Sequence, residues 1–140
     1  MGPIRAGELH YPRIPKEYWE HRMLSIKALG LNALSVYVFW NLHEIKKGEF
    51  DFVSGQRDLK TFISLATKHG FKILIRPGPY VCAEWDFGGL PARLLGIPSI
   101  KIRSHDPVYE SEVRIYFSAL AEVIRPYLHI NGGNIILLQI

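Results

Sequence analysis

The sequence predicts an α/β fold in which parallel strands alternate with amphipathic helices. Three segments carry apolar residues at helical spacing, and four short apolar runs lie before, between and after them. The expected order is therefore strand, helix, strand, helix, strand, helix, strand. Uninterrupted apolar runs are typical of strands covered on both faces, as in parallel sheets, and right-handed crossovers are expected between such strands.

Each predicted helix has a start signal, an apolar stripe and a stop. The helices are expected to begin after Pro15, near Arg57-Asp58 and at Asp106-Pro107, and to end at Gly30, Gly70 and Pro126. Their stripes at helical spacing are Trp19, Met23 and Ile26; Leu59, Phe62, Ile63 and Ala66; and Val113, Tyr116, Phe117, Leu120 and Ile124.

The predicted strands are residues 4–11, 33–40, 72–76 and 135–140. Long connections follow the second and third strands, from Leu42 to about Gln56 and from Pro77 to about Ser104. Long loops in a compact domain are usually functional or disordered, and barrels and open α/β folds place their sites beyond the carboxyl ends of strands. These two loops are therefore the candidate site.

Two architectures fit four parallel strands: a small open sheet, or half of an eight-stranded barrel. No glycine-rich phosphate-binding motif follows any strand, so a nucleotide fold is not indicated. A complete barrel typically needs ~250 residues. On the second interpretation, these 140 residues form an incomplete (βα)8 TIM barrel with about four strands and three helices.

Composition excludes several functional classes. The formal net charge is +4, but the basic residues are scattered and the longest basic run is Lys46-Lys47, so no nucleic-acid partner is expected. No window approaches the ~18 uninterrupted apolar residues of a membrane span. Residues 1–5 lack the pattern of a secretory signal. The single cysteine, Cys82, excludes an internal disulfide and a multi-cysteine zinc site.

Three residues near the long loops are candidates for ligand binding, each with a structural alternative. Glu84 is flanked by Pro-Gly-Pro and Gly-Gly turns that predict a fixed loop, where a carboxylate can accept two hydroxyl donors; the alternative is a solvated carboxylate. Tyr37 is either a ligand residue or a core tyrosine with a satisfied hydroxyl. Cys82 would by default be a small buried apolar residue. Aromatic residues that could form a flat apolar platform for a ligand are Trp40, Tyr80, Trp85 and Phe87.

The first predicted strand carries its own polar pair. Glu8 and His10 share a strand face and are expected either to point toward the site or, as we favour, to form a buried pair that fixes strand register. Arg76, at a strand end, is expected to pair with a carboxylate such as Glu8. No HExxH spacing surrounds His43-Glu44, so no metal is expected.

Four blocks of the sequence resemble the family 35 glycoside hydrolases. They occur in family order and cover nearly the whole chain. The blocks are residues 7–15 (GELHYPRIP), 37–44 (YVFWNLHE), 76–85 (RPGPYVCAEW) continued by 88–91 (GGLP), and 132–139 (GGNIILLQ). The sequence departs from the family pattern at Ile45, where proline is common, and around Gly96-Ile97-Pro98.

The resemblance implies a (βα)8 barrel, a retaining β-galactosidase mechanism and no cofactor. It also implies that Tyr37, Cys82, Ala83 and Glu84 bind the galactose. In the family, the acid/base Glu lies in an Asn-Glu pair just beyond the fourth strand and the nucleophile Glu lies much later. Because the sequence stops at Gln139-Ile140, we expect neither catalytic residue within it, and we expect residues 1–140 to be the N-terminal half of the catalytic barrel, truncated at the fourth strand.

Three functions stay open at this stage. The first is hydrolysis of terminal β-linked galactose, with a β-galactoside as substrate, the remainder of the barrel as partner, and no activity in these 140 residues alone. The second is a non-catalytic galactose-binding or complementing half-barrel. The third is an α/β interaction protein that closes by self-association. In the chain as a separate molecule, residues 135–138 would form an unpaired apolar edge, prone to aggregate or to pair with another chain.

Overall fold

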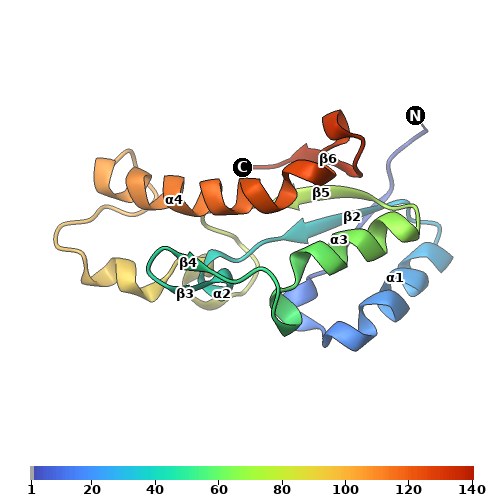
Figure 1. The fold of residues 1–140 in the computed structure, drawn as a ribbon, viewed down its shortest axis with the longest axis horizontal. Coiled ribbons are helices and arrows are strands. Elements are labelled where there is room, and N and C mark those ends of the chain that lie inside the picture. The colour runs from blue at the N-terminus through green and yellow to red at the C-terminus, as the bar shows by residue number, and fades with distance from the viewer. Residues whose placement is uncertain (1) are drawn as a thin grey trace.

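A four-stranded parallel sheet lies at the centre of the structure, a computed structural model that describes residues 2–140 (Figure 1). Its strands, in spatial order, are β1 (Ala6–Glu8), β2 (Ala33–Tyr37), β5 (Lys72–Arg76) and β6 (Ile135–Leu138). Each strand pairs in parallel with the next one. Sequence order and spatial order coincide, as they do in successive βαβ units of a barrel, so the predicted strand order is confirmed.

Three long helices connect these strands, as the sequence predicts. They are α1 (Trp19–Ala28), α3 (Leu59–Lys68) and α4 (Pro107–Ile124). The predicted caps are present: the Asp58 side chain accepts a hydrogen bond from the Thr61 amide, and Asp106 accepts one from the Val108 amide. The remaining elements are the short α2 (Trp40–His43), the antiparallel hairpin of β3 (Glu44–Lys46) and β4 (Glu49–Phe50), and several 3₁₀ turns.

One apolar core joins all three helices to one face of the sheet. The sheet contributes Leu34, Val36, Ile73, Ile75 and Ile135, and the helices contribute Trp19, Met23, Leu59, Phe62, Ile63, Ala66, Tyr116, Leu120 and Ile124. The predicted stripes are thus buried, except that Ile26, Val113 and Phe117 are only partly covered. Because side chains alternate along strands, the other face carries a different set of residues. Glu8, Ser35 and Leu74 lie side by side on it, and Tyr37 lies next to Arg76.

The sequence predicts three strands that are longer than those observed. The last of them, predicted over residues 135–140, ends at Leu138. The first strand stops at Glu8, and residues Tyr11–Arg13 form a 3₁₀ turn, because Pro12 has no amide hydrogen to give to a sheet. The second strand stops at Tyr37, because Trp40–His43 turns into a helix. The loop predicted after Leu42 contains the β3–β4 hairpin.

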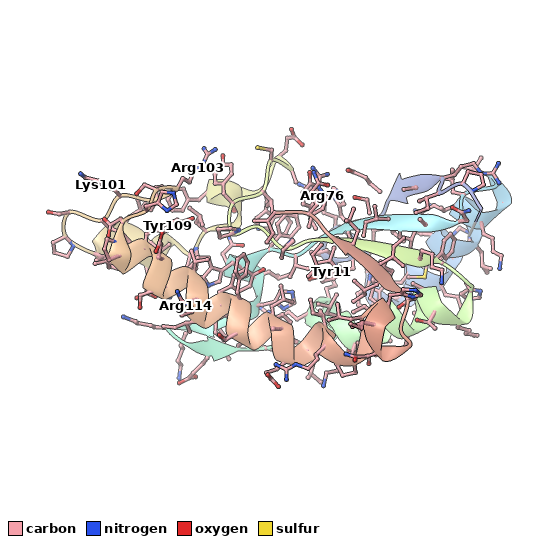
Figure 2. The ribbon with its side chains drawn as sticks, turned by 90° about the horizontal axis from the view of Figure 1, so that it is seen from above. Tyr11, Arg76, Lys101, Arg103, Tyr109 and Arg114 are labelled. Carbon is pink, nitrogen blue, oxygen red and sulfur yellow. The ribbon has the colours of Figure 1, made fainter. Side chains whose placement is uncertain are left out.

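A buried histidine links the first turn to that hairpin. The Tyr11 hydroxyl and His43 Nε2 are 2.6 Å apart, and His43 Nδ1 lies 2.7 Å from the Asp51 carbonyl oxygen. A carbonyl can only accept, so Nδ1 carries the proton and Nε2 accepts from Tyr11. Figure 2 shows Tyr11 between the sheet and the helices. Burial lowers the pKa of His43 to about 4, so the ring is neutral in the folded chain.

His43 should make stability depend on pH. Below about pH 6.5 the unfolded chain binds a proton at His43, whereas the folded chain does so only near pH 4. The free energy of unfolding should therefore fall as the pH is lowered from about 6.5 to 4, by up to about 3 kcal/mol from this residue. Urea unfolding at a series of pH values measures it.

The matched variants are His43→Asn and His21→Asn. His43→Asn removes the titrating ring and should flatten this part of the pH dependence, while His21 is exposed on α1 and its substitution should leave the profile unchanged. An equally steep profile in His43→Asn would show that other groups cause the acid instability.

Candidate active site

A small hollow opens at the carboxyl ends of β2 and β5. Its volume is about 160 Å³, and its lining includes Tyr37, Arg76, residues 78 and 80–82, and residues 139–140. We call it the strand-end pocket. Figure 2 labels Arg76 on this side of the sheet. Ligand pockets that enclose a small molecule usually have volumes of ~300–1,000 Å³, so the strand-end pocket is too small to enclose such a molecule by itself.

Tyr37 lies at the base of the strand-end pocket. Its side chain is buried, and its hydroxyl lies 3.5 Å from the Cys82 carbonyl oxygen, a long hydrogen bond. The Arg76 guanidinium lies over the ring, 4.2 Å from its centroid, and the His10 ring meets it edge-on at 5.0 Å. A cation over an aromatic face is favourable. Tyr37 is therefore held firmly while its hydroxyl faces the loop that follows β5.

The three other predicted site residues lie in that loop, with different environments. Cys82 lines the strand-end pocket with its side chain exposed, so the alternative of a buried apolar cysteine is wrong. Ala83 is buried in a small cluster with Tyr37, Phe39 and Val81. Glu84 is exposed and has a left-handed backbone, with φ at 46°. The structure thus brings Tyr37, Cys82 and Ala83 together and leaves Glu84 exposed, outside the lining of the strand-end pocket.

The loop is fixed by close packing around Gly88. The predicted Gly-Gly turn is present, and Gly88 has φ at 60°. A Cβ atom at this position would lie 2.1 Å from the Tyr80 ring, so only glycine fits beneath that side chain. The Gly88 carbonyl also accepts a hydrogen bond from the Val81 amide at 2.8 Å. Residues 81–88 therefore form a fixed loop, as the turn residues predict.

An aromatic stack borders the loop. The Trp85 ring is parallel to that of Phe39 at 4.2 Å, and its indole N–H donates to Asn41 Oδ1 at 2.9 Å. Of the predicted platform residues, Trp85 is half-buried, but Trp40 is fully buried and stacks on Tyr116 inside the core. Trp40 therefore cannot form part of a sugar platform. The strand's alternation turns Phe39, which the sequence reasoning missed, toward the loop instead.

A chain of polar side chains crosses the strand ends behind the pocket. Arg76 Nη1 donates to Glu8 Oε1 at 2.9 Å, so the predicted pair is confirmed. Glu8 Oε2 lies 3.2 Å from His10 Nε2, and Arg13 donates to His10 Nδ1 at 2.8 Å. The Glu8 side chain is 52% exposed, so the interpretation of Glu8 and His10 as a buried pair is wrong. This face of the sheet is open, which is why the carboxylate stays hydrated.

A second charged cluster anchors the long loops to α4. Arg93 donates from Nε and Nη2 to the two oxygens of Glu44, at 2.9 and 2.7 Å, and its Nη1 lies 2.7 Å from Glu112. The Glu44 side chain is 1% exposed. These hydrogen bonds, with Lys47 also beside Glu112, raise the pKa of Arg93 and lower that of Glu112 against its burial. The cluster joins the β3–β4 hairpin, the loop after β5 and helix α4.

Comparison with known proteins identifies the family. The model of the glycosyl hydrolases family 35 matches residues 3–140. The chain belongs to glycosyl hydrolase family 35. A beta-galactosidase from Mus musculus is 50% identical over 135 residues, which cover 96% of this chain and 21% of the relative. A Beta-galactosidase from Xanthomonas manihotis is 46% identical over 137 residues, which cover 98% of this chain and 23% of the relative.

Solved structures support the same fold for this family 35 chain. A beta-galactosidase from Halorubrum lacusprofundi superimposes with a TM-score of 0.71 at 20% identity, covering 97% of this chain and 21% of its own. A GH5_18 protein from Streptomyces cattleya, in complex with GlcNAc, gives a TM-score of 0.68 at 17% identity, covering 98% and 33%. The predicted class, a partial TIM barrel, is confirmed. The chain spans about a fifth of the length of the curated relatives named above.

Among residues 2–140, no three His, Cys, Asp or Glu side chains are grouped so that they could hold a metal ion. None of the helices formed by these residues is long and apolar enough to cross a membrane.

Removing Arg93 should destabilise the loops. Arg93→Met leaves the nearly fully buried Glu44 carboxylate without its partner, and breaking a buried pair from one side costs about 3–5 kcal/mol. Chemical unfolding measures the loss. The double variant Arg93→Met with Glu44→Gln removes both charges and should recover a large part of it. A loss below about 0.5 kcal/mol in the single variant would contradict this role for the cluster.

Proposed function

We propose that this chain contributes one wall of the active site of a retaining β-galactosidase that hydrolyses terminal β-linked galactose. The observation that carries the proposal is the strand-end pocket. It lies where family 35 residues and the carboxyl ends of two barrel strands meet, which is the face where barrel enzymes bind substrate. The names of the relatives support the substrate class.

Galactose binding is proposed for four residues on this wall. The Tyr37 hydroxyl and the Cys82 backbone lie at the strand-end pocket, Ala83 supplies backbone atoms beside them, and the exposed Glu84 carboxylate in the same loop accepts ring hydroxyls. A carboxylate offers two oxygens and can accept two donors at once. The same negative charge would also favour the positive charge that develops on the anomeric carbon. Trp85 and Phe39 would supply the apolar surface beside the ring.

The catalytic carboxylates are proposed to lie outside residues 1–140. A retaining enzyme needs two carboxyl groups ~5–5.5 Å apart on either side of the glycosidic bond. Glu84 is the one carboxylate among the proposed ligand residues, and Glu8 is occupied by Arg76 and His10. The acid/base and the nucleophile would therefore come from later strands of the barrel. No cofactor is required by this mechanism.

A specific observation favours the second candidate, a complementing half-barrel. The last strand, β6, is an edge of the sheet, and Leu137, Leu138 and Ile140 are 48%, 44% and 89% exposed. A neighbouring apolar hollow of about 200 Å³ is lined by residues that include Phe117, Leu120 and Ile124 of α4. An apolar edge beside an apolar groove is what further βα units of a barrel would cover.

Glu84 is the first residue to test. Glu84→Gln keeps the shape and removes the charge, so it should weaken galactose binding by about 1.5–3 kcal/mol, or roughly 10- to 150-fold. The affinity is measured from the saturation of the change in tryptophan fluorescence when the protein is titrated with galactose and, for comparison, with glucose. The control is Glu17→Gln, an exposed glutamate in the turn before α1. If the unmodified chain, Glu84→Gln and Glu17→Gln bind galactose with equal affinity, Glu84 is excluded as a galactose-binding residue.

Hydrolysis tests where the catalytic carboxylates lie. The purified 140-residue chain should release no aryl alcohol from an aryl β-galactoside above background, because both catalytic carboxylates would be absent. Activity should appear when residues carrying the remaining strands are supplied, either fused or in trans. Turnover by the 140-residue chain alone, abolished in Glu84→Gln, would contradict the proposed placement of the catalytic pair.

A further inference from the structure

One arginine holds the backbone of the proposed sugar-binding loop. Arg13 donates from Nη2 to the carbonyl oxygens of Ala83 and Glu84, the latter at 2.8 Å. Arg13 belongs to the turn after β1, 70 residues before Ala83, so the contact ties two distant segments together. Its guanidinium carbon also lies 5.5 Å from the Trp85 ring centroid and 5.8 Å from that of Phe39.

The loop needs such a support at this point. Glu84 has φ at 46° and Phe87 has φ at 50°, a left-handed conformation that residues with a side chain seldom adopt. Such a backbone persists only where its surroundings enforce it. A planar guanidinium can meet two adjacent carbonyls and an aromatic surface together, which an ammonium group on a flexible stem cannot do in the same way.

His10 orients the guanidinium. Arg13 Nη1 lies 2.8 Å from His10 Nδ1, and because arginine can only donate, Nδ1 must be the accepting nitrogen. The ring proton is then on Nε2, which donates to Glu8 Oε2 at 3.2 Å. The other Glu8 oxygen accepts from Arg76. A second proton on His10 would set an N–H against the Arg13 N–H, so the arrangement exists only with a neutral ring.

We propose that Arg13, held by neutral His10, is the positioning residue that fixes residues 83–84 and thereby presents the Glu84 carboxylate to the sugar. The charged and titratable groups that face His10 are Glu8 from β1, Arg13 from the following turn, Tyr37 from β2 and Arg76 from β5. Burial lowers the pKa of His10, Glu8 opposes this effect, and Arg13 and Arg76 add to it. The sugar as the ligand of residues 83–84 rests on the proposed function, whereas the contacts of Arg13 that hold these residues do not.

The test uses NMR on the ¹⁵N-labelled chain. Arg13→Lys keeps the charge but loses the planar fork, so backbone order parameters of residues 83–85 should fall from the rigid range, about 0.85, toward 0.6. The Trp85 indole signal should shift, whereas that of buried Trp40 should not. The matched control is Arg22→Lys, which changes an exposed arginine on α1. It should alter neither the order parameters of residues 83–85 nor the Trp85 indole signal. An unaltered loop in folded Arg13→Lys would overturn the proposal.

A pH titration of the unmodified chain tests the same idea without a variant. As the pH is lowered, the Trp85 indole signal and the order parameters of residues 83–85 should change at the same pH midpoint as the protonation of the His10 ring. His10→Asn offers an accepting oxygen near the place of Nδ1 at every pH, so it should keep the loop ordered and remove the pH dependence. Titration of His10 with no change at residues 83–85 would overturn the proposal.

Galactose titration of the same samples separates this proposal from the proposed function. Failure of the unmodified chain to bind galactose, with a loosened loop in Arg13→Lys, would remove the sugar-binding role and support the positioning role. Equal galactose affinity in the unmodified chain and in Arg13→Lys, with an equally rigid loop, would support the binding function and overturn the positioning role.

Discussion

The single apolar core between the sheet and its three helices is the constraint on which the rest of the molecule depends. Strand residues alternate between two faces, and one face is committed to that core through Leu34, Val36, Ile73 and Ile75. The opposite face carries only a small apolar cluster, formed by Tyr37, Phe39, Val81 and Ala83. It is the face that carries Glu8, Tyr37 and Arg76, at the end where parallel strands deliver their loops. The place of the proposed site therefore follows from two facts: the parallel strands all end at this edge, and alternate side chains along each strand point to the same face.

That division also explains why the polar groups behave differently on the two sides. On the helical side, His43, Glu44 and Glu112 are buried, and each has specific partners because an unpaired buried polar group is costly. On the open side, Glu8 is half-exposed and still pairs with Arg76 and His10. The buried groups fix the loops in place, while the open ones remain accessible to a ligand. Groups that stabilise the loops and groups of the proposed binding site thus lie on different sides of the sheet.

The elements that local chemistry determines were predictable from the sequence. Asp58 and Asp106-Pro107 begin helices because their side chains and ring suit a helix N-terminus, and the apolar stripes of α3 and α4 face the core. The strand order followed from the alternation of elements, and the Arg76–Glu8 pair followed from complementary charges on one face. In each of these cases the signal lay within a few residues or within one face of the sheet.

The errors occurred where tertiary contacts decide. Pro12 and the turn at Trp40 shortened two strands, and Trp40 turned into the core rather than toward a ligand. Cys82 is exposed because its loop leaves the sheet beside an open pocket. Arg13 gave no local signal for its loop contacts, since the carbonyl groups that it holds lie about 70 residues away, in a loop whose path only the fold defines.

The same distance gives Arg13 its structural importance. A loop after β5 could be closed by its own turns, and Gly88 beneath Tyr80 does this locally. Such turns fix the loop's shape but not its position relative to the neighbouring strands. Position requires contacts from outside the loop. Besides the contacts of Trp85 with Phe39 and Asn41, two sets involve charged groups: Arg93 with Glu44 and Glu112 on the helical side, and Arg13 with His10 on the strand-end side. The first set is buried and pairs full charges, so it resists change. The second is partly exposed and depends on a neutral histidine, so it is the side on which the loop can be adjusted.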